Sequence, residues 1–423
     1  MRSEPLPRPD TAARHDALAE RVACFAERTL AGFPWRVELL DWRGVVTQAG
    51  GDAPHWCGQP LVVTLHEPAA ARALLARDPM AFLEHVLAGR AALAGNLYVI
   101  SDLRSHARLD LAWPRAFLAS LAHRAFQTPR RARASVRSHY DIPQAALDLY
   151  LDRAYRAYSC AMFEAPERLL RAELVRPGAG RTDDFDSLEK AQWRKFQDAI
   201  DFVAPEAGDE LLDIGCGYGG QLHVALASHR FRRIVGWTHS ANQVREGAKL
   251  LAAFDPARWS IREGDYRQDD HVYDHVMSTG MVSHVGPRGL VPYVRNVRRR
   301  IRRGGRYLHH ALMTPHTALP LDFYPGTLFH KRWVWPGYHW FTLGQHVRAL
   351  ERHGFEVQRA VNLSAHYAKT TAAWYERMMQ HADAMRSHVG DATFRAWQLY
   401  LAGTSGNFTN HGIHVYRLYC QAV

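Results

Sequence analysis

The sequence lacks the features that mark several classes of protein. Its 423 residues contain five widely scattered cysteines and no CxxC pair, which argues against both a disulfide framework and a structural zinc site. No run of about 18 apolar residues is present, as a membrane-spanning helix would require. Charged side chains occupy residues 1–20, where a signal peptide would need an apolar block. We therefore expect a cytoplasmic protein.

Metal and phosphate-loop motifs are also missing. The chain has 25 histidines, but none stands at an HExxH or comparable ligand spacing, so we expect no metal site. His309 and His310 are adjacent, so on a strand their side chains would point to opposite faces. No Gly-Lys-Ser/Thr follows the glycine-rich segment at 211–220, which excludes a P-loop.

Positive charge, in contrast, is present in excess. The net charge is +11, and arginine is densest in residues 128–140 and 295–306. Such an excess favours an anionic partner, either nucleic acid or acidic lipid head groups. No RNA-recognition motif or helix-turn-helix spacing is found, so we expect a lipid surface and no nucleic acid. Residues 295–306 are predicted to form a helix with a basic face that stops at Gly304 and Gly305.

Two units are predicted along the chain. Residues 1–127 mix strand-like runs with helical ones, of which 68–93 is the longest, and predict a smaller α+β domain. The arginine-rich segment 128–138 is the predicted linker. Over residues 139–423, short apolar runs alternate with helical stretches. This alternation predicts an α/β domain with a doubly wound, Rossmann-like parallel sheet.

The segment LLDIGCGYGG at 211–220 has the form of a strand that ends in a tight turn and opens a helix. Gly215, Gly217 and Gly220 satisfy the GxGxxG pattern. Glycine lets the backbone turn sharply and lets a ligand approach without a Cβ atom in the way. The pattern alone fits either a dinucleotide or another adenosine-bearing cofactor.

The neighbouring strand ends favour S-adenosylmethionine. A dinucleotide site requires an acid about 20 residues further on. The strand there ends instead in Thr-His-Ser at 238–240. Asp213, two residues before Gly215, suits the acidic-x-Gly-x-Gly form of an S-adenosylmethionine loop. Asp265 and Tyr266 end the third strand, where a carboxylate can accept from the adenine amino group and a ring can flank the purine.

Seven blocks resemble, in order, the cyclopropane fatty acid synthase family of S-adenosylmethionine-dependent methyltransferases. They are HYDIPQAALDLYLDRAYRAYSCAMFE (139–164), SLEKAQWRKF (187–196), LLDIGCGYGG (211–220), VGWTHSANQ (235–243), MSTGMVSHVG (277–286), AHYAKTTAAWYERM (365–378) and FRAWQLYLAG (394–403). Residues 1–127 resemble, more weakly, the lipid-binding domain of long bacterial members. The resemblance implies a homodimeric enzyme at the periphery of the inner membrane, acting on unsaturated acyl chains of membrane phospholipids.

The resemblance also implies a role for each residue of the cofactor site. It places Tyr158 and Ser159 at the methionine end, Gly215 and Gly217 against the cofactor, Thr238 and Gln243 at the ribose, and Asp265 and Tyr266 at the adenine.

In this family the acyl double bond attacks the methyl group of the cofactor, and the resulting cation loses a proton as a cyclopropane ring closes. The resemblance implies that a bicarbonate ion is the base, held in a polar nest by Cys160, His309 and Tyr367. Burying such an anion without hydrogen-bond donors would cost several kcal/mol.

Three positions depart from the family pattern. Ser283 stands before His284 where the family has glutamate, Ala311 replaces an isoleucine, and Thr404 replaces a frequent cysteine. The departures fall at the base site and leave three outcomes open. Bicarbonate still binds, or a histidine (His284 or His309) takes the proton, or the cation ends as a methyl-branched or methylene chain.

The segment 321–345 predicts the substrate side. Its eight aromatic residues suit a tunnel for an acyl chain or a packed lid, and Lys331 with Arg332 could meet a phosphate head group. Two other functions stay open: a methyltransferase acting on small molecules such as amines, and a lipid-binding protein without catalysis. The aromatic residues are Phe323, Tyr324, Phe329, Trp333, Trp335, Tyr338, Trp340 and Phe341.

Overall fold

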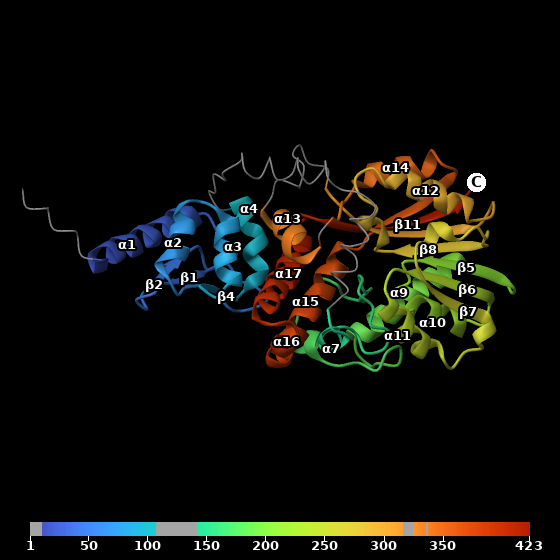
Figure 1. Ribbon diagram of the computed structural model, residues 1–423, viewed down its shortest axis with the longest axis horizontal. Coiled ribbons are helices and arrows are strands. Elements are labelled where there is room, and N and C mark those ends of the chain that lie inside the picture. The colour runs from blue at the N-terminus through green and yellow to red at the C-terminus, as the bar shows by residue number, and fades with distance from the viewer. Residues whose placement is uncertain (1–10, 107–141, 316–324, 336) are drawn as a thin grey trace, which may run out of the picture.

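Two β-sheets organise the protein in a computed structural model that describes residues 11–106, 142–315, 325–335 and 337–423 (Figure 1). The first sheet has four strands in the order β2-β1-β3-β4. The second has seven, in the order β10-β11-β9-β8-β5-β6-β7. The predicted linker at 128–138 and both domain boundaries beside it lie outside the described residues.

The small sheet belongs to the N-terminal unit. Strand β1 pairs antiparallel with β2 and parallel with β3, and β3 pairs antiparallel with β4. Its elements are α1 (Thr11–Leu30), β1 (Val37–Leu40), β2 (Val46–Ala49), β3 (Leu61–Leu65), α2 (Pro68–Leu75), α3 (Pro79–Leu87), β4 (Ala91–Gly95), the 3₁₀ helix η1 (Leu97–Asp102) and α4 (Leu103–His106). The helical character predicted for 68–93 is confirmed for most of that range, which forms the two helices α2 and α3, but not for its end, which is a strand. Asp78 caps a second helix by accepting from Ala81 N at 3.0 Å, and the residues after Gly89 form β4.

The large sheet confirms the predicted doubly wound architecture. The strands β5 (Asp209–Ile214), β6 (Phe231–Thr238), β7 (Trp259–Glu263), β8 (His275–Thr279) and β9 (Arg306–Met313) are parallel. Strand β11 (His414–Ala422) runs antiparallel between β9 and β10 (Phe355–Asn362). Strand β5 is buried along its whole length, as the central strand of a covered parallel sheet must be.

Helices cover both faces of this sheet (Figure 1). On one face lie α9 (Leu188–Val203), α10 (Gly220–Ala227) and α11 (Ala241–Leu251), and on the other lie α12 (Leu290–Arg299) and α14 (Leu343–Glu351). Helix α12 begins and ends earlier than predicted, and it ends before Gly304 because Ile301 is buried in a bridge to Tyr273. The short elements are α7 (Gln144–Leu147), α8 (Arg171–Val175), η2 (Pro256–Arg258), η3 (Tyr266–Gln268), η4 (Met281–His284), α13 (Pro325–Phe329) and the π-helix η6 (His330–Val334).

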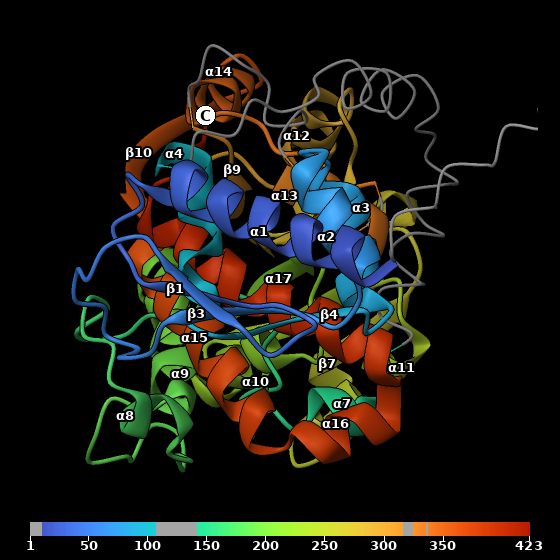
Figure 2. The same ribbon diagram turned by 90° about the vertical axis from the view of Figure 1, so that its left-hand side faces the viewer.

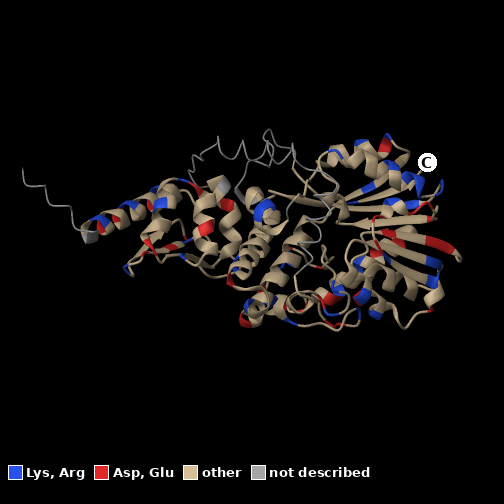
Figure 3. Ribbon diagram, in the orientation of Figure 1, with Lys and Arg blue, Asp and Glu red and all other residues tan. Residues whose placement is uncertain are grey.

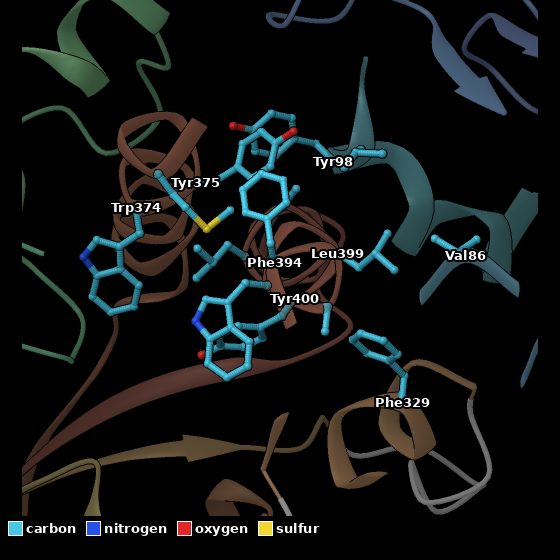
Figure 4. Packing of buried hydrophobic residues seen from close by; sticks show 14 of the residues in the cluster. Val86, Tyr98, Phe329, Trp374, Tyr375, Phe394, Leu399 and Tyr400 are labelled. Carbon is cyan, nitrogen blue, oxygen red and sulfur yellow. The ribbon is translucent and has the colours of Figure 1, made fainter. Parts of the chain in front are cut away.

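Three C-terminal helices stand between the two sheets: α15 (Ser364–Gln380), α16 (Ala382–Val389) and α17 (Asp391–Thr409) (Figures 1 and 2). Side chains of α15 and α17 form one apolar cluster with those of the N-terminal unit (Figure 4). Polar contacts fix the same junction: Tyr98 donates to Glu376 at 2.9 Å, and Asn410 donates to Asp102 at 2.7 Å. The labelled members of the cluster are Val86, Tyr98, Phe329, Trp374, Tyr375, Phe394, Leu399 and Tyr400.

The helix α17 approaches η1 closely at Gly406. A Cβ atom built at this position would lie 1.9 Å from the carbonyl oxygen of Tyr98. Only glycine therefore permits this contact.

Among the described residues, no helix combines the length and the apolar composition needed to cross a membrane.

Candidate active site

A cavity of about 270 Å³ lies at the carboxyl ends of the parallel strands. The loops that follow β5, β6, β7 and β8 all contribute to its wall, as does the segment 158–160 before α9. Ligands of open α/β sheets bind at this edge, because the connections diverge there and leave a crevice. The glycine-rich turn after β5 forms one side of it.

Gly215 and Gly217 of this turn have different roles. Gly215 has φ +81°, and a Cβ atom there would lie 2.9 Å from Cβ of Met281. Gly217 has φ +55° and lines the cavity, and a Cβ atom there would meet nothing within 4 Å. Gly215 is thus needed for packing, whereas Gly217 keeps open space for a ligand.

The end of β6 carries a buried hydroxyl and amide. Thr238 Oγ1 donates to Oε1 of Gln243, which lies in the first turn of α11. Ser240 caps that helix by accepting from the backbone N–H of Gln243 at 3.3 Å. Both Thr238 and Gln243 line the cavity. The structure thus brings together the two residues predicted for the ribose.

The predicted adenine residues lie at the end of β7. Asp265 and Tyr266 both line the cavity. The Asp265 carboxylate already accepts from Arg267, at 2.8 Å from its Nε. A carboxylate has about four lone-pair sites, so it can accept from an amino group as well. Tyr266 stands edge-on to Tyr293, with ring centroids 6.0 Å apart.

The segment before α9 supplies the predicted methionine end. Tyr158 stacks on Trp374, with centroids 5.0 Å apart and planes within 3°. Ser159 Oγ accepts from Nζ of Lys195 at 2.8 Å, and the Ser159 carbonyl accepts from Gln192 at 2.9 Å. Tyr158 and Ser159 line the cavity.

Lys195 and Gln192 were missed by the sequence analysis. Both are fully buried on α9, and burial lowers the pKa of Lys195. They hold Ser159 in place rather than lining the cavity themselves. The signal was available, because two long polar residues three apart interrupt the apolar stripe of a helix.

Asp213 lies beneath the cavity rather than in its wall. It is 3% exposed on β5, and burial raises its pKa to about 7, an effect that Lys195 partly offsets. The structure therefore places it below the glycine turn and not at the ligand surface. Its predicted role as a direct cofactor ligand has no support in this position.

Five of the six predicted catalytic residues line one part of the cavity: Cys160, Ser283, His284, Tyr367 and Thr404. The sixth, His309, does not. Its ring meets Tyr307 Oη at 2.8 Å and Nδ1 of His346 at 2.9 Å, under α14. Of this adjacent pair it is His310 that lines the cavity, so the prediction that His309 belongs to the nest is wrong. The reason is strand alternation, which sends adjacent side chains to opposite faces.

Arg417 fixes the state of His310. Its Nε donates to Nδ1 of His310 at 3.4 Å, while its Nη1 donates to the Asp198 carboxylate and to the carbonyl of Lys195. Burial, with help from Arg417 and Lys195, lowers the pKa of His310 well below its usual range. The ring is therefore neutral, and because Nδ1 is an acceptor, its proton sits on Nε2.

Three other polar groups that line the cavity, those of Cys160, His284 and Ser283, are also uncharged. Burial raises the pKa of the Cys160 thiol to about 12, so it stays protonated and is a poor nucleophile. Burial lowers the pKa of His284 to about 4, so this ring is neutral at pH 7. Ser283 Oγ is buried and has no hydrogen-bond partner among the described residues. An unsatisfied buried hydroxyl is costly unless a ligand or water completes it.

The wall opposite the glycine turn is aromatic and aliphatic. Trp335, Tyr338 and Trp340 of the predicted aromatic segment line it, together with Tyr400, Phe408 and Ile413. Phe329, Trp333 and Phe341 are described but do not line the cavity, and Phe323 and Tyr324 lie outside the described residues.

The basic pair of this segment is engaged within the protein. Arg332 pairs with Glu84 at 2.9 Å, and the Lys331 ammonium lies 5.7 Å from the ring centroid of Tyr338. The structure thus gives no support to the prediction that these two residues meet a phosphate.

Comparisons with known proteins identify the family of the chain. The family described as mycolic acid cyclopropane synthetase matches residues 127–418. The tuberculostearic acid methyltransferase of Mycobacterium tuberculosis is 31% identical over 291 residues, which cover 68% of this chain and 64% of that protein. The cyclopropane-fatty-acyl-phospholipid synthase of Escherichia coli is 27% identical over 292 residues, 69% of each chain. The match thus spans about two thirds of the length of these curated relatives.

A solved structure shares the fold. Mycolic acid cyclopropane synthase, in complex with SAH and CTAB, aligns with a TM-score of 0.60 and 25% sequence identity. The alignment covers 68% of this chain and 98% of that one.

Proposed function

Since the chain belongs to the mycolic acid cyclopropane synthetase family of S-adenosylmethionine-dependent methyltransferases, we propose that it adds a one-carbon unit from that cofactor to the double bond of an unsaturated phospholipid acyl chain, closing a cyclopropane ring. The observation that carries the proposal is a single cavity. It joins the glycine turn, a cluster of neutral polar groups and an aromatic wall.

The residues present fit the cofactor. Gly217 leaves open space, Thr238 and Gln243 offer a hydroxyl and an amide, and Asp265 offers a carboxylate for an amino group. S-adenosylmethionine supplies an electrophilic methyl group on a sulfonium centre. Tyr158, held against Trp374, presents an aromatic ring to the cavity, and such rings attract cations.

The polar cluster suits a reaction in which a carbocation must lose a proton. A charged nucleophile beside a cation would be trapped by it, and the neutral state of Cys160, His284 and His310 avoids this. His310 Nε2–H, the Cys160 thiol and the Ser283 hydroxyl can donate to a small anion. We propose bicarbonate for that position, with Ser283 taking the place of the glutamate expected from the resemblance.

A second product is favoured by Ser283 itself. Serine is shorter than glutamate and carries no charge, so it is a weaker partner for a bicarbonate hydroxyl. One relative of this chain is named a tuberculostearic acid methyltransferase. The alternative is therefore that the same cation loses a different proton, which gives a methylene chain or a methyl-branched chain that keeps a double bond. The aromatic wall counts against a small polar acceptor such as an amine.

Lipid analysis separates these outcomes. We would express the chain, and its Ser283→Glu variant, in cells that lack an enzyme of this family. Mass spectrometry and NMR of the phospholipids would then follow. A cyclopropane ring made by the unchanged chain supports the proposal. A methylated acyl chain made by the unchanged protein, together with a cyclopropane ring made by the Ser283→Glu variant, supports the alternative and shows that Ser283 is responsible.

The control is binding of S-adenosylhomocysteine, measured by calorimetry on both proteins. Equal affinities are expected, because Ser283 is not among the residues assigned to the cofactor, which are Tyr158, Ser159, Gly217, Thr238, Gln243 and Asp265. Binding without any change in the lipids would contradict both products and favour a small-molecule acceptor.

A further inference from the structure

The helices α12 and α14 pack side by side on one face of the large sheet, and arginines are frequent on these helices and directly beside their ends (Figures 1 and 3). Six arginine side chains on or beside the two helices are exposed, and none makes an ion pair or hydrogen bond with a residue that the structure describes. We name them the α12–α14 arginine face: Arg288, Arg295, Arg299, Arg303, Arg348 and Arg352.

The neighbouring Arg298, in contrast, has a structural role. Arg298 is half-buried and donates to the carbonyls of Gly354, Ile301 and Val423, at 3.1, 3.3 and 2.6 Å. It therefore ties α12 to the end of the chain. The six residues of the arginine face make no comparable bond.

The charge pattern of the face works against helix stability. Arg295 and Arg299 are four apart on α12, as Arg348 and Arg352 are on and just after α14, and like charges at this spacing repel. Glu351 is the one acid in the two helices. Repulsion between these arginines does not stabilise the fold. Binding to an external anionic partner explains their clustering better.

The face also reaches the cavity. Val291, one turn before Arg295, is 38% exposed. Pro292, next along the helix, is exposed and lines the cavity. Apolar groups flanked by arginines suit the boundary between head groups and acyl chains. A nucleic acid would make no use of this apolar edge.

We propose that the α12–α14 arginine face docks the protein on an anionic lipid bilayer. This inference rests on the proposed function, since a phospholipid substrate is what brings the protein to a bilayer. The guanidinium groups would bind head-group phosphates, and Val291 and Pro292 would meet the interface beside the cavity. Binding would be electrostatic and would fall as salt is raised.

Vesicle sedimentation of the full chain tests the proposal. Vesicles of phosphatidylcholine would be compared with vesicles of equal parts phosphatidylcholine and phosphatidylglycerol. We expect binding to the anionic vesicles only. The variant with Arg295→Gln, Arg299→Gln and Arg348→Gln should bind them about 100-fold more weakly, at roughly fivefold for each charge. Arginine and glutamine have similar helix propensities, so the fold should persist.

A matched variant carries the same change of charge on the N-terminal unit. Arg14, Arg21 and Arg72 are exposed on α1 and α2 and make no ion pair with a described residue. Changing all three to glutamine should leave vesicle binding within about twofold. If this variant loses binding and the α12–α14 variant keeps it, the proposal is overturned.

Two further outcomes keep this inference separate from the enzymatic one. Duplex DNA that binds the wild type, and competes with vesicles through the same arginines, would assign the face to nucleic acid and overturn the proposal. Methyl transfer to phospholipid in neutral detergent micelles should be equal in wild type and the α12–α14 variant. Docking through this face without transfer to any lipid would refute the proposed function and leave the docking intact.

Discussion

Gly217 combines a left-handed backbone conformation with open space at the wall of the cavity. The change Gly217→Ala places a methyl group in the open cavity and a side chain at φ +55°, at a cost in the left-handed region of about 1–2 kcal/mol. We expect the affinity for S-adenosylhomocysteine, measured by calorimetry, to fall at least about tenfold, because the added methyl group takes up ligand space, and 1.4 kcal/mol of lost binding free energy corresponds to a factor of ten.

The turn glycine Gly44 provides the control. It has φ +85° and, like Gly217, open space around its added Cβ, but it lies between β1 and β2 in the N-terminal unit. Gly44→Ala should lower the thermal midpoint to a similar degree and leave the affinity unchanged. Equal losses of affinity in both variants would show that strain alone is responsible.

Single residues also show where prediction from the sequence stops. The adjacency of His309 and His310 indicated that only one of them can face a ligand. Every residue of β9 from Tyr307 to Ala311 is buried, so no exposed side chain marks which face is which. Which of the two histidines faces the cavity depends on the elements that pack around β9. These include α14 and β11, so the answer is not contained in the local sequence.

At the scale of elements, the junction between α17 and η1 depends on the absence of one side chain. Gly406→Ala would drive a methyl group into the carbonyl of Tyr98, which forces the helix away from the N-terminal unit. We expect a loss of about 1–3 kcal/mol in the free energy of unfolding, measured by urea titration, as for an overpacked core.

Gly403 lies in the same helix, with nothing within 4 Å of its added Cβ. Gly403→Ala should stabilise the protein by about 0.5–1 kcal/mol through helix propensity. A stabilising effect of Gly406→Ala as well would contradict the close approach seen in the structure.

The elements that the sequence predicts well are those whose pattern is local. Apolar runs that end in glycine or in polar turn residues predict β5 to β9, because buried parallel strands read as continuous apolar segments. The cluster shared by α3, η1, α15 and α17 could not be predicted in this way. Its partners are separated by hundreds of residues and leave no periodic signal.

For the whole molecule, buried histidines predict a loss of stability in acid. Burial lowers the pKa of His284 to about 4 and of His309 to about 3, and lowers it also for His310 and His346. Unfolding returns each pKa to about 6.5, so below that pH the unfolded chain binds protons that the folded chain does not. Each such histidine therefore destabilises the fold by about 1.4 kcal/mol at one pH unit below 6.5. Asp213, with its raised pKa, acts in the opposite direction.

Urea titrations at pH 7.5, 6.5 and 5.5 would measure this dependence. The double variant His309→Asn, His346→Asn should lose less stability between pH 6.5 and 5.5 than the wild type, by about 2 kcal/mol for two histidines, because part of the effect is already present at pH 6.5. The exposed His388, changed to Asn, should leave the dependence unchanged. A double variant as acid-sensitive as the wild type would rule out this origin.

The cluster between the N-terminal unit and the C-terminal helices also bears on synthesis of the chain. Tyr98 bonds to a residue 278 positions later, so the apolar side of the first unit leaves the ribosome long before its cover exists. At about 5–20 residues per second, the interval is roughly 15–60 s. During that time the nascent chain exposes an apolar surface that promotes aggregation. We therefore expect its folding to depend on chaperones more than the stability of the folded protein would suggest.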